Sequence, residues 1–419
     1  MDDYDVAIVG GGLAGLIAGC ETAGAGLKTV LFESAAELGG RARTRRQDGF
    51  HFNQGPHAVY AAGALRRALD DLGVGYKGAP APIAGGQLLW GETLHPLPGG
   101  AASLLTATPL GVRDRLELAT TLGKLSQGKI AGEGRSLSEV TRAFRPRVRR
   151  VIETLARLST YANAPDTLDA QAALDQIRLA FANVLYLDGG WETLIAGLAR
   201  TARGRGAEIA AGLAVTALAP HETGWRVTLA DGRALSARAV ILAADPATCA
   251  SLAPDVPDIA AAAGRVAPVR AVCLDLALSA LPAPGNGFAL GVDEPLYLSV
   301  HSKTARLAPD GGALIHLAWY LAPAEAPTKA HLERLERLAD QLQPGWRGLE
   351  VARQQLLGIA VAHDYPRPGR ARAVISPSAP APLYLAGDWV GEAGLLSDAS
   401  AASARLAASS AIARLNACA

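Results

Sequence analysis

The N-terminal segment constrains the fold more strongly than any other part of the sequence. An apolar run from Tyr4 to Val9 predicts a strand, and the small residues from about Leu13 to Ala25 predict a helix. A second apolar run from Thr29 to Phe32 predicts another strand. Between the first strand and the helix lies a G-x-G-x-x-G motif formed by Gly10, Gly12 and Gly15. This context predicts a βαβ unit that binds a dinucleotide.

Each position of the motif has a physical reason. Gly10 permits a tight turn, Gly12 lets a pyrophosphate approach backbone N–H groups at the helix start, and Gly15 lets helix and strand pack closely. Glu33 ends the second strand, where its carboxylate can accept hydrogen bonds from ribose hydroxyls. The alternative is a glycine-rich turn without a ligand. The other contacts predicted here are Leu13, Ala14 and Ser34.

The segment after Glu33 distinguishes FAD from NAD as the predicted dinucleotide. Residues 38–43 read Leu-Gly-Gly-Arg-Ala-Arg, which resembles the GG motif of the flavin amine oxidase and phytoene desaturase superfamily. The resemblance places Gly40, Arg41 and Arg43 beside the phosphates of FAD, and a guanidinium matches phosphate oxygens. The alternative is a pair of solvated surface arginines.

Three more segments carry the resemblance. Residues 49–57 look like the turn that passes the flavin ring, which implies contacts from Gly55, Pro56 and His57. Residues 385–389 look like the C-terminal signature in which Gly387 and Asp388 contact the pyrophosphate and ribityl chain. The helix after it, entered through Leu395 and Leu396, would point its N-terminus at the flavin.

The Asp188-Gly189-Gly190-Trp191 turn resembles the middle GG segment of the superfamily, followed by a strand whose backbone meets the adenine at Val215. The resemblance implies an α/β fold with a Rossmann-type, glutathione reductase-like FAD-binding domain and a second, α+β substrate domain. We expect residues 1–60, 188–262 and 372–419 in the first domain. The second would combine a mostly helical part, 61–187, with a strand-rich part, 263–371.

Departures from the superfamily pattern refine this prediction. Asn53 stands where many relatives carry Asp, and no cysteine or histidine occupies an obvious covalent flavin position, so we expect non-covalent FAD. Amine oxidases often place a lysine near the flavin. The strand from Val269 to Leu278 offers Arg270 and no lysine, which weakens an amine oxidase interpretation.

No residue is assigned a catalytic role from the sequence. A neutral His57 could orient substrate or accept a proton, or it could simply pack beside the ring. Trp319, Tyr320 and Trp389 could wall a substrate cavity, although aromatic residues on strands more often belong to a core.

By resemblance, the leading hypothesis is an FAD-dependent desaturase or dehydrogenase of the phytoene dehydrogenase-like branch. It would act on a small, largely apolar, isoprenoid-like substrate, with residues 58–187 forming a tunnel. The first alternative is an amine oxidase that forms an imine and hydrogen peroxide. The second is a non-redox lipid or prenyl carrier like the GDP dissociation inhibitors.

Composition excludes other classes. Lys plus Arg (40) balance Asp plus Glu (39), which argues against nucleic acid as a partner, and the four cysteines have no metal-ligand spacing. No apolar run is long enough to span a membrane, and no secretory signal precedes the first strand. We therefore expect a cytoplasmic protein without a metal. Peripheral membrane contact through residues 101–125 stays open, as do the electron acceptor and the oligomeric state.

Overall fold

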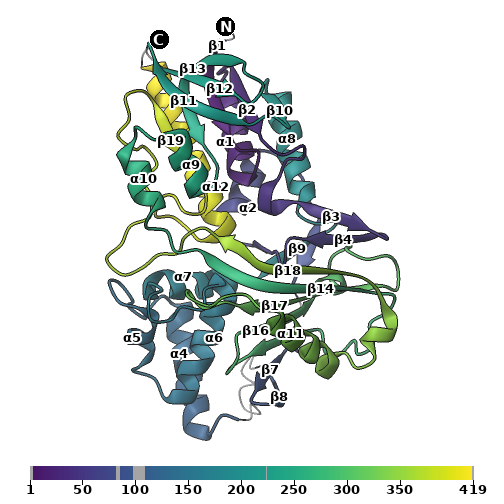
Figure 1. Cartoon of the computed structure of the whole chain (residues 1–419). Coiled ribbons are helices and arrows are strands. Elements are labelled where there is room, and N and C mark those ends of the chain that lie inside the picture. Colours follow the sequence, from purple (N-terminus) through teal and green to yellow (C-terminus); the bar gives the residue numbers. More distant parts are fainter. Residues whose placement is uncertain (1–2, 82–84, 98–108, 223, 418–419) are drawn as a thin grey trace.

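The computed structural model describes residues 3–81, 85–97, 109–222 and 224–417. Two large sheets dominate these residues (Figure 1). The first sheet has the order β10-β2-β1-β13-β12-β11, with β19 beside β13. Its strands are β1 (Asp3–Val9), β2 (Thr29–Glu33), β10 (Glu208–Ala211), β11 (Val215–His221), β12 (Gly224–Leu229), β13 (Ala234–Leu242) and β19 (Leu383–Leu385).

Parallel pairing brings the carboxyl ends of β1, β2 and β13 to one edge of the first sheet. Val9 of β1 lies beside Phe32 of β2 and Leu242 of β13, and all three strands run in the same direction. These strands therefore end together at the turn that begins with Gly10. In open α/β sheets, ligands bind at this carboxyl edge.

Helices cover both faces of the first sheet. On one face, alternate residues of β1 and β13 pack with α1 (Leu13–Gly24), α2 (Ala64–Asp71), α8 (Glu192–Gly204) and α12 (Leu396–Asn416). On the other face, the remaining residues of β1 and β13 pack with α9 (Pro246–Leu252), α10 (Pro257–Ala263) and side chains of β11 and β12. The strands are buried on both sides, which explains why they read as continuous apolar runs.

The second sheet has the order β18-β14-β17-β16-β15-β7-β8. Its strands are β7 (Gln87–Trp90), β8 (Thr93–Pro96), β14 (Val269–Leu278), β15 (Phe288–Gly291), β16 (Leu296–Val300), β17 (Ala313–Tyr320) and β18 (Glu350–Ala362). Helix α11 (Lys329–Leu342) covers the face formed by residues such as Val272 and Leu274. Because side chains alternate along a strand, Ala271 and Cys273 face the other way, toward a cavity.

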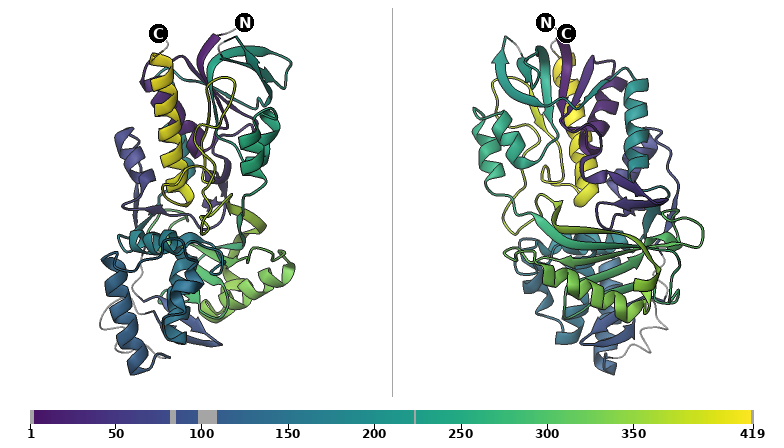
Figure 2. Two further views of the ribbon diagram at one scale, coloured as in Figure 1. Left: turned by 90° about the vertical axis from the view of Figure 1, so that its left-hand side faces the viewer. Right: turned by 45° about the vertical axis from the view of Figure 1, so that its right-hand side comes forward.

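A group of four helices and several small elements complete the described chain. Helices α4 (Val112–Ser126), α5 (Leu137–Thr141), α6 (Pro146–Thr160) and α7 (Ala170–Ala180) lie at the end of the molecule far from both termini (Figure 2). The remaining elements are β3 (Thr44–Gln47), β4 (Phe50–Asn53), β5 (Val59–Tyr60), β6 (Gly78–Pro80), β9 (Val184–Leu187), η1 (Gly40–Ala42), η2 (His301–Lys303) and η3 (Trp346–Leu349).

The mixed α/β fold is confirmed, whereas one local prediction is wrong. The apolar spacing of residues 168–185 predicts a helix over that whole range, but helix α7 ends at Ala180, because Asn183 adopts a left-handed φ of 74° and β9 begins at Val184. The longest strand, β18, has no counterpart among the predicted elements. The division into two domains with the boundaries given above stays a prediction.

Within the described ranges, no helix is long and apolar enough to cross a membrane. Residues 101–108 of the stretch considered for membrane contact lie outside the described residues, and so does Cys418.

Candidate functional site

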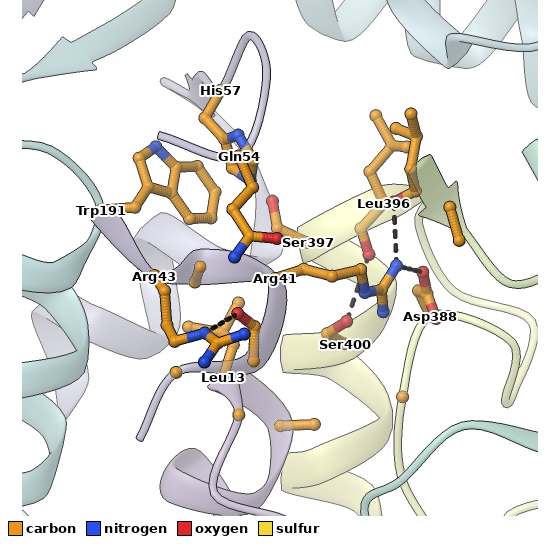
Figure 3. Close-up of a pocket in the computed structure, with 18 of the residues that line it drawn as sticks. Leu13, Arg41, Arg43, Gln54, His57, Trp191, Asp388, Leu396, Ser397 and Ser400 are labelled. Carbon is orange, nitrogen blue, oxygen red and sulfur yellow. Dashed lines mark hydrogen bonds and ion pairs between the residues drawn. The ribbon is translucent and has the colours of Figure 1, made fainter. Parts of the chain in front are cut away.

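A cavity of about 700 Å³ opens where the carboxyl edge of the first sheet meets the second sheet. Val9 and Phe32 line it from the first sheet, and Ala271 and Cys273 line it from β14. Figure 3 shows side chains from the glycine-rich turn, the Gly40 segment and the start of α12 converging on this space.

Most of the predicted cofactor-binding residues line this cavity. They are Gly10, Gly12, Leu13, Ala14, Glu33, Ser34, Gly40, Arg41, Pro56, His57, Val215, Gly387, Asp388 and Leu396. Arg43 lines it as well. The fold therefore brings together segments that lie more than 300 positions apart in the sequence.

Gly15, Gly55 and Leu395 are not among the lining residues. A Cβ on Gly15 would lie 1.9 Å from the carbonyl oxygen of Gly10, so Gly15 allows close packing of helix and turn. Gly55 has a φ of +82°, and a Cβ there would meet Cys273 Sγ at 3.1 Å. Leu395 is buried and precedes the first turn of α12.

The start of α1 fits a pyrophosphate. Its N-cap, Gly12, provides no side-chain hydrogen bond, and the first turn holds no acidic residue. The atom nearest to a Cβ built on Gly12 is the carbonyl oxygen of Gly39, at 4.0 Å, so the backbone here borders open space. Unpaired N–H groups and the positive end of the helix dipole favour an anion at this position.

Glu33 fits the ribose end of a dinucleotide. One carboxylate oxygen accepts a hydrogen bond from Gly11 N at 2.8 Å, and the other accepts one from Ala35 N at 2.8 Å. These bonds hold the side chain in place. A carboxylate offers about four acceptor positions, which leaves room for ribose hydroxyls.

An ion-pair cluster formed by Arg41, His363 and Asp388 also lines the cavity. Arg41 donates to Asp388 at 2.6 Å (Figure 3). It also donates to the carbonyl oxygen of Val361 at 2.9 Å. Nδ1 of His363 lies 3.0 Å from the other Asp388 oxygen. Burial alone would raise the pKa of Asp388, but the Arg41 guanidinium and the His363 hydrogen bond hold that pKa well below its ordinary value. Asp388 is therefore ionised and fixed.

The start of α12 is a second helix N-terminus at the cavity. Leu396, Ser397 and Ser400 line it, and no side chain caps the helix. The only acidic residue of the first turn, Asp398, is buried and accepts a hydrogen bond from Leu65 N. The positive end of α12 thus points to the place where the resemblance expects the flavin.

His57 lies at the cavity with its ring edge-on to Trp191, and the ring centroids are 4.9 Å apart. Its Nδ1 lies 3.0 Å from Gly55 O, which acts as acceptor and therefore places the proton on Nδ1. Burial lowers the pKa of His57 to about 4. The imidazole is neutral at physiological pH, and Nε2 is left as an acceptor.

An aromatic wall on the substrate side was not predicted. It consists of Tyr60, Tyr161, Tyr186, Phe288 and Tyr297. The three aromatic residues considered from the sequence do not line the cavity: Trp389 and Tyr320 are fully buried, and Trp319 packs against His331. Single aromatic residues in helices and strands give no signal that separates cavity from core. His363 was missed because β18, which leads to it, was not predicted.

Asn53 has a structural role away from the cavity. Its Oδ1 accepts hydrogen bonds from Thr44 Oγ1 at 2.8 Å and from Trp191 N at 3.0 Å, which ties β4 to the start of α8. Arg270 donates to the carbonyl oxygen of Glu325 and does not line the cavity. Among the described lining residues there is no lysine.

Backbone strain concentrates at this cavity. Among the described residues, five non-glycine positions have positive φ, and three of them line it: Tyr161, Asn183 and Leu396. A left-handed conformation costs roughly 1–2 kcal/mol per residue. Such strain persists where the surroundings fix it, and it is frequent at functional sites. No group of three metal-ligating side chains occurs in the described part of the chain.

A doubly wound sheet, two uncapped helix ends and an arginine beside one cavity indicate a dinucleotide-binding protein. The particular family follows from comparison with known proteins. The chain belongs to the flavin containing amine oxidoreductases, because residues 13–412 match the sequence pattern of that family. It is an FAD-dependent oxidoreductase, and the carrier alternative is set aside.

Two of the curated relatives that match this chain do so over short segments. A carotenoid 3,4-desaturase from Haloarcula japonica is 50% identical over 56 residues, which is 13% of this chain and 11% of the relative. A pseudooxynicotine dehydrogenase from a Pseudomonas species is 47% identical over 47 residues, or 11% of this chain and 10% of that protein. The matched segments thus span about a tenth of each relative.

Solved structures match over nearly the whole chain. An oxidoreductase from Methanosarcina mazei has a TM-score of 0.74 at 17% identity, covering 96% of this chain and 99% of that one. Cyclohexylamine oxidase from Brevibacterium oxydans has a TM-score of 0.71 at 14% identity, covering 99% and 100%. At these identities the likeness establishes the fold.

Proposed function

We propose that this protein is a dehydrogenase or desaturase that removes a hydride from a largely apolar, uncharged substrate. One observation carries the proposal. Among the described residues, the charged side chains that line the cavity are Glu33, Arg41, Arg43, Asp245 and Asp388. All of them come from the segments that carry the dinucleotide motifs or adjoin the first sheet, and the described residues within 61–187 and 263–371 contribute no Asp, Glu, Lys or Arg to the lining.

The lack of charged side chains on the cavity walls formed by the described residues within 61–187 and 263–371, here called the substrate side, favours an uncharged substrate. A charged group moved from water into such a space loses its hydration, and a partner of opposite charge is needed to offset that cost. On the substrate side the lining offers alkyl, aromatic and neutral polar groups instead, including Leu158, Cys273, Phe288 and Ile359. An uncharged, largely apolar molecule suits this surface.

Bound FAD would supply the acceptor for a hydride, and the chain's own groups would position the reacting C–H bond and exclude water. Gly12 and the start of α1 would hold the pyrophosphate, Glu33 the ribose, and Arg41 with Asp388 the phosphate and ribityl region. Neutral His57 would orient the substrate through Nε2.

Isoprenoid compounds are the first substrates to test. Support comes from the uncharged walls and from the short match to a carotenoid desaturase. A cytoplasmic location stays a prediction.

An amine oxidase is the second candidate, favoured by the aromatic wall. Tyr161, Tyr186, Phe288 and Tyr297 all line the cavity. Aromatic rings can bind an alkylammonium group through cation–π interactions without a carboxylate.

An anaerobic flavin spectrum tests both candidates. Purified holoprotein is mixed with isoprenoid hydrocarbons, apolar alcohols and aliphatic amines, and bleaching of the flavin absorbance is followed before air is admitted. We expect bleaching by apolar compounds. Stoichiometric hydrogen peroxide with several amines, and no bleaching by any apolar compound, would establish the second candidate instead.

We also propose peripheral membrane contact at the start of α4, where Val112 and Leu116 are 80% and 71% exposed. Such contact would let an apolar substrate enter from a bilayer. Sedimentation with liposomes tests it, and a protein that stays in the supernatant contradicts it. Val112→Ser with Leu116→Ser is the variant expected to release the protein.

A further inference from the structure

The cavity side of the second sheet contains a cross-strand row of polar residues. The register pairs Gln354 of β18 with Asp275 of β14, Asp275 with His316 of β17, and His316 with Ser299 of β16. Asp275, His316 and Ser299 are all buried. The residues on either side of Asp275 on this face, Cys273 and Ala277, are apolar. A buried polar row in such a place calls for an explanation.

Hydrogen bonds fix the state of the central pair. His316 Nδ1 lies 2.6 Å from Asp275 Oδ1, and Gln354 Nε2 donates to Asp275 Oδ2 at 2.9 Å. A carboxylate accepts, so the His316 proton is on Nδ1 and Nε2 carries a lone pair. Among the described residues, His316 Nε2 has no hydrogen-bond partner.

The row reaches the cavity through three residues, Tyr186, Tyr297 and His301, which we call the polar corner. The rings of His301 and His316 lie 4.3 Å apart, and His301 stacks on Tyr186 at 3.7 Å. His301 Nε2 lies 3.0 Å from the Tyr297 hydroxyl. All three residues of the corner line the cavity, whereas His301 Nδ1 has no partner among the described residues.

The polar corner is electrically neutral. Burial lowers the pKa of His301 well below its ordinary value, and the nearby His316 and His57 add to that effect. Burial raises the pKa of Tyr297 well above its ordinary value. A neutral imidazole and a neutral phenol both donate and accept hydrogen bonds, so they match a neutral group that does the same.

We propose that the polar corner binds a hydroxyl group of the substrate and accepts its proton when the carbon that bears it loses hydride. This inference rests on the proposed function and narrows it, because the substrate class becomes an apolar alcohol. The Tyr297 hydroxyl is the catalytic group, and His301, His316 and Asp275 are positioning residues behind it.

The step balances in atoms and electrons. The C–H bond breaks, and the hydrogen with both electrons passes to the oxidised flavin. The substrate O–H bond breaks, its electrons form the second bond of the carbonyl, and its proton passes to Tyr297. The Tyr297 proton passes to His301 Nε2, and the resulting imidazolium lies beside the His316 ring, whose Nδ1 is held by the Asp275 carboxylate.

Ligand binding to the FAD-loaded protein tests the hydroxyl site without turnover. Benzyl alcohol and benzyl methyl ether differ in the O–H group, and the shift of the flavin absorbance reports the binding of each. We expect a preference of about 10-fold for the alcohol, because one hydrogen bond is made in a buried place. Tyr297→Phe should reduce the preference to about 1, and His301→Gln should lower it as well.

Tyr161→Phe is the matched control. Tyr161 also lines the cavity, but its hydroxyl donates to Pro56 O at 3.0 Å and lies outside the polar corner. The control should change the affinities for alcohol and ether alike. Flavin content and the circular dichroism spectrum verify that each variant is folded. A wild-type preference near 1, or a preference retained by both Tyr297→Phe and His301→Gln, overturns the proposal.

Two readouts separate the proton transfer from the binding. In the ¹⁵N spectrum of histidine-labelled holoprotein, Asp275→Asn should change the His316 signal from the Nδ1–H tautomer, and an unchanged signal contradicts the positioning role. Anaerobic flavin reduction by apolar alcohols should slow about 100-fold in Tyr297→Phe. Reduction by hydrocarbons but no alcohol overturns this inference alone, whereas reduction by amines only, with the alcohol preference intact, overturns the proposed function.

Discussion

The substitution Gly12→Ala should weaken cofactor binding without destabilising the fold, because Gly12 lines the cavity and an added Cβ would meet no atom closer than 4.0 Å. Its φ of −79° is open to alanine, and the nearest atom to an added Cβ is a carbonyl oxygen at 4.0 Å. The free energy of unfolding of the FAD-free protein should therefore change by less than about 0.5 kcal/mol. The new methyl group would occupy the path of the pyrophosphate. Overpacking costs about 1–3 kcal/mol, which is roughly a 5- to 150-fold loss of FAD affinity.

Gly15→Ala is the contrasting variant in the same motif. Its Cβ would lie 1.9 Å from the carbonyl oxygen of Gly10, a backbone atom that cannot rotate away. We expect the free energy of unfolding to fall by about 3 kcal/mol or more. Urea unfolding followed by circular dichroism measures stability, and quenching of FAD fluorescence measures affinity. Wild-type FAD affinity in Gly12→Ala would refute the assignment of the pyrophosphate to this turn.

Three further substitutions test individual contacts. Burial raises the pKa of Asp398 to about 6, above the value of 3.8 for an unperturbed carboxyl, so its ionisation destabilises the fold as pH rises from about 4 to 6. Asp398→Asn, which keeps the acceptor for Leu65 N, should add about 3 kcal/mol to the free energy of unfolding above about pH 6 and almost none below about pH 4. A urea series across this range checks the prediction, and a gain independent of pH contradicts it. Asp388→Asn leaves Arg41 without its ion-pair partner. Because 37% of the Arg41 side chain is exposed, we expect the free energy of unfolding of the FAD-free protein to fall by about 1–3 kcal/mol in urea. An unchanged urea midpoint would show that the ion pair adds no stability. Asn53→Ala removes two buried hydrogen bonds and should lower the free energy of unfolding by about 1–3 kcal/mol while FAD affinity, measured by fluorescence quenching of the still-folded protein, stays near wild type.

The dinucleotide site could be predicted because its signals are local. The roles of Gly10 and Gly15 depend on the turn and the helix that immediately follow them, and a spacing of a few residues records that geometry. The match at Gly387 and Asp388 could be added only by resemblance, since nothing within that short segment shows that Arg41 will be its partner.

Strand β18 escaped prediction for a physical reason. Its centre is polar and partly exposed, with Arg353, Gln354 and Gln355 in sequence, and Gly358 has a φ of +83°. Its pairing with β14 shifts register at three places, so the alternation that reveals a regular strand is lost. This strand nevertheless brings Val361 to Arg41 and leads directly to His363, which contacts Asp388.

The polar row of Gln354, Asp275, His316 and Ser299 could not be predicted from single sequence segments. Asp275 sits in an apolar strand and His316 in another, and each alone reads as an isolated polar residue. Only the register of four strands sets Gln354, Asp275, His316 and Ser299 side by side. A buried carboxylate in an apolar sheet is costly unless it is hydrogen-bonded, and here both of its oxygens are. The bonds hold the Asp275 charge and orient His316, whose ring lies beside His301, the residue that accepts the Tyr297 proton in the proposed step.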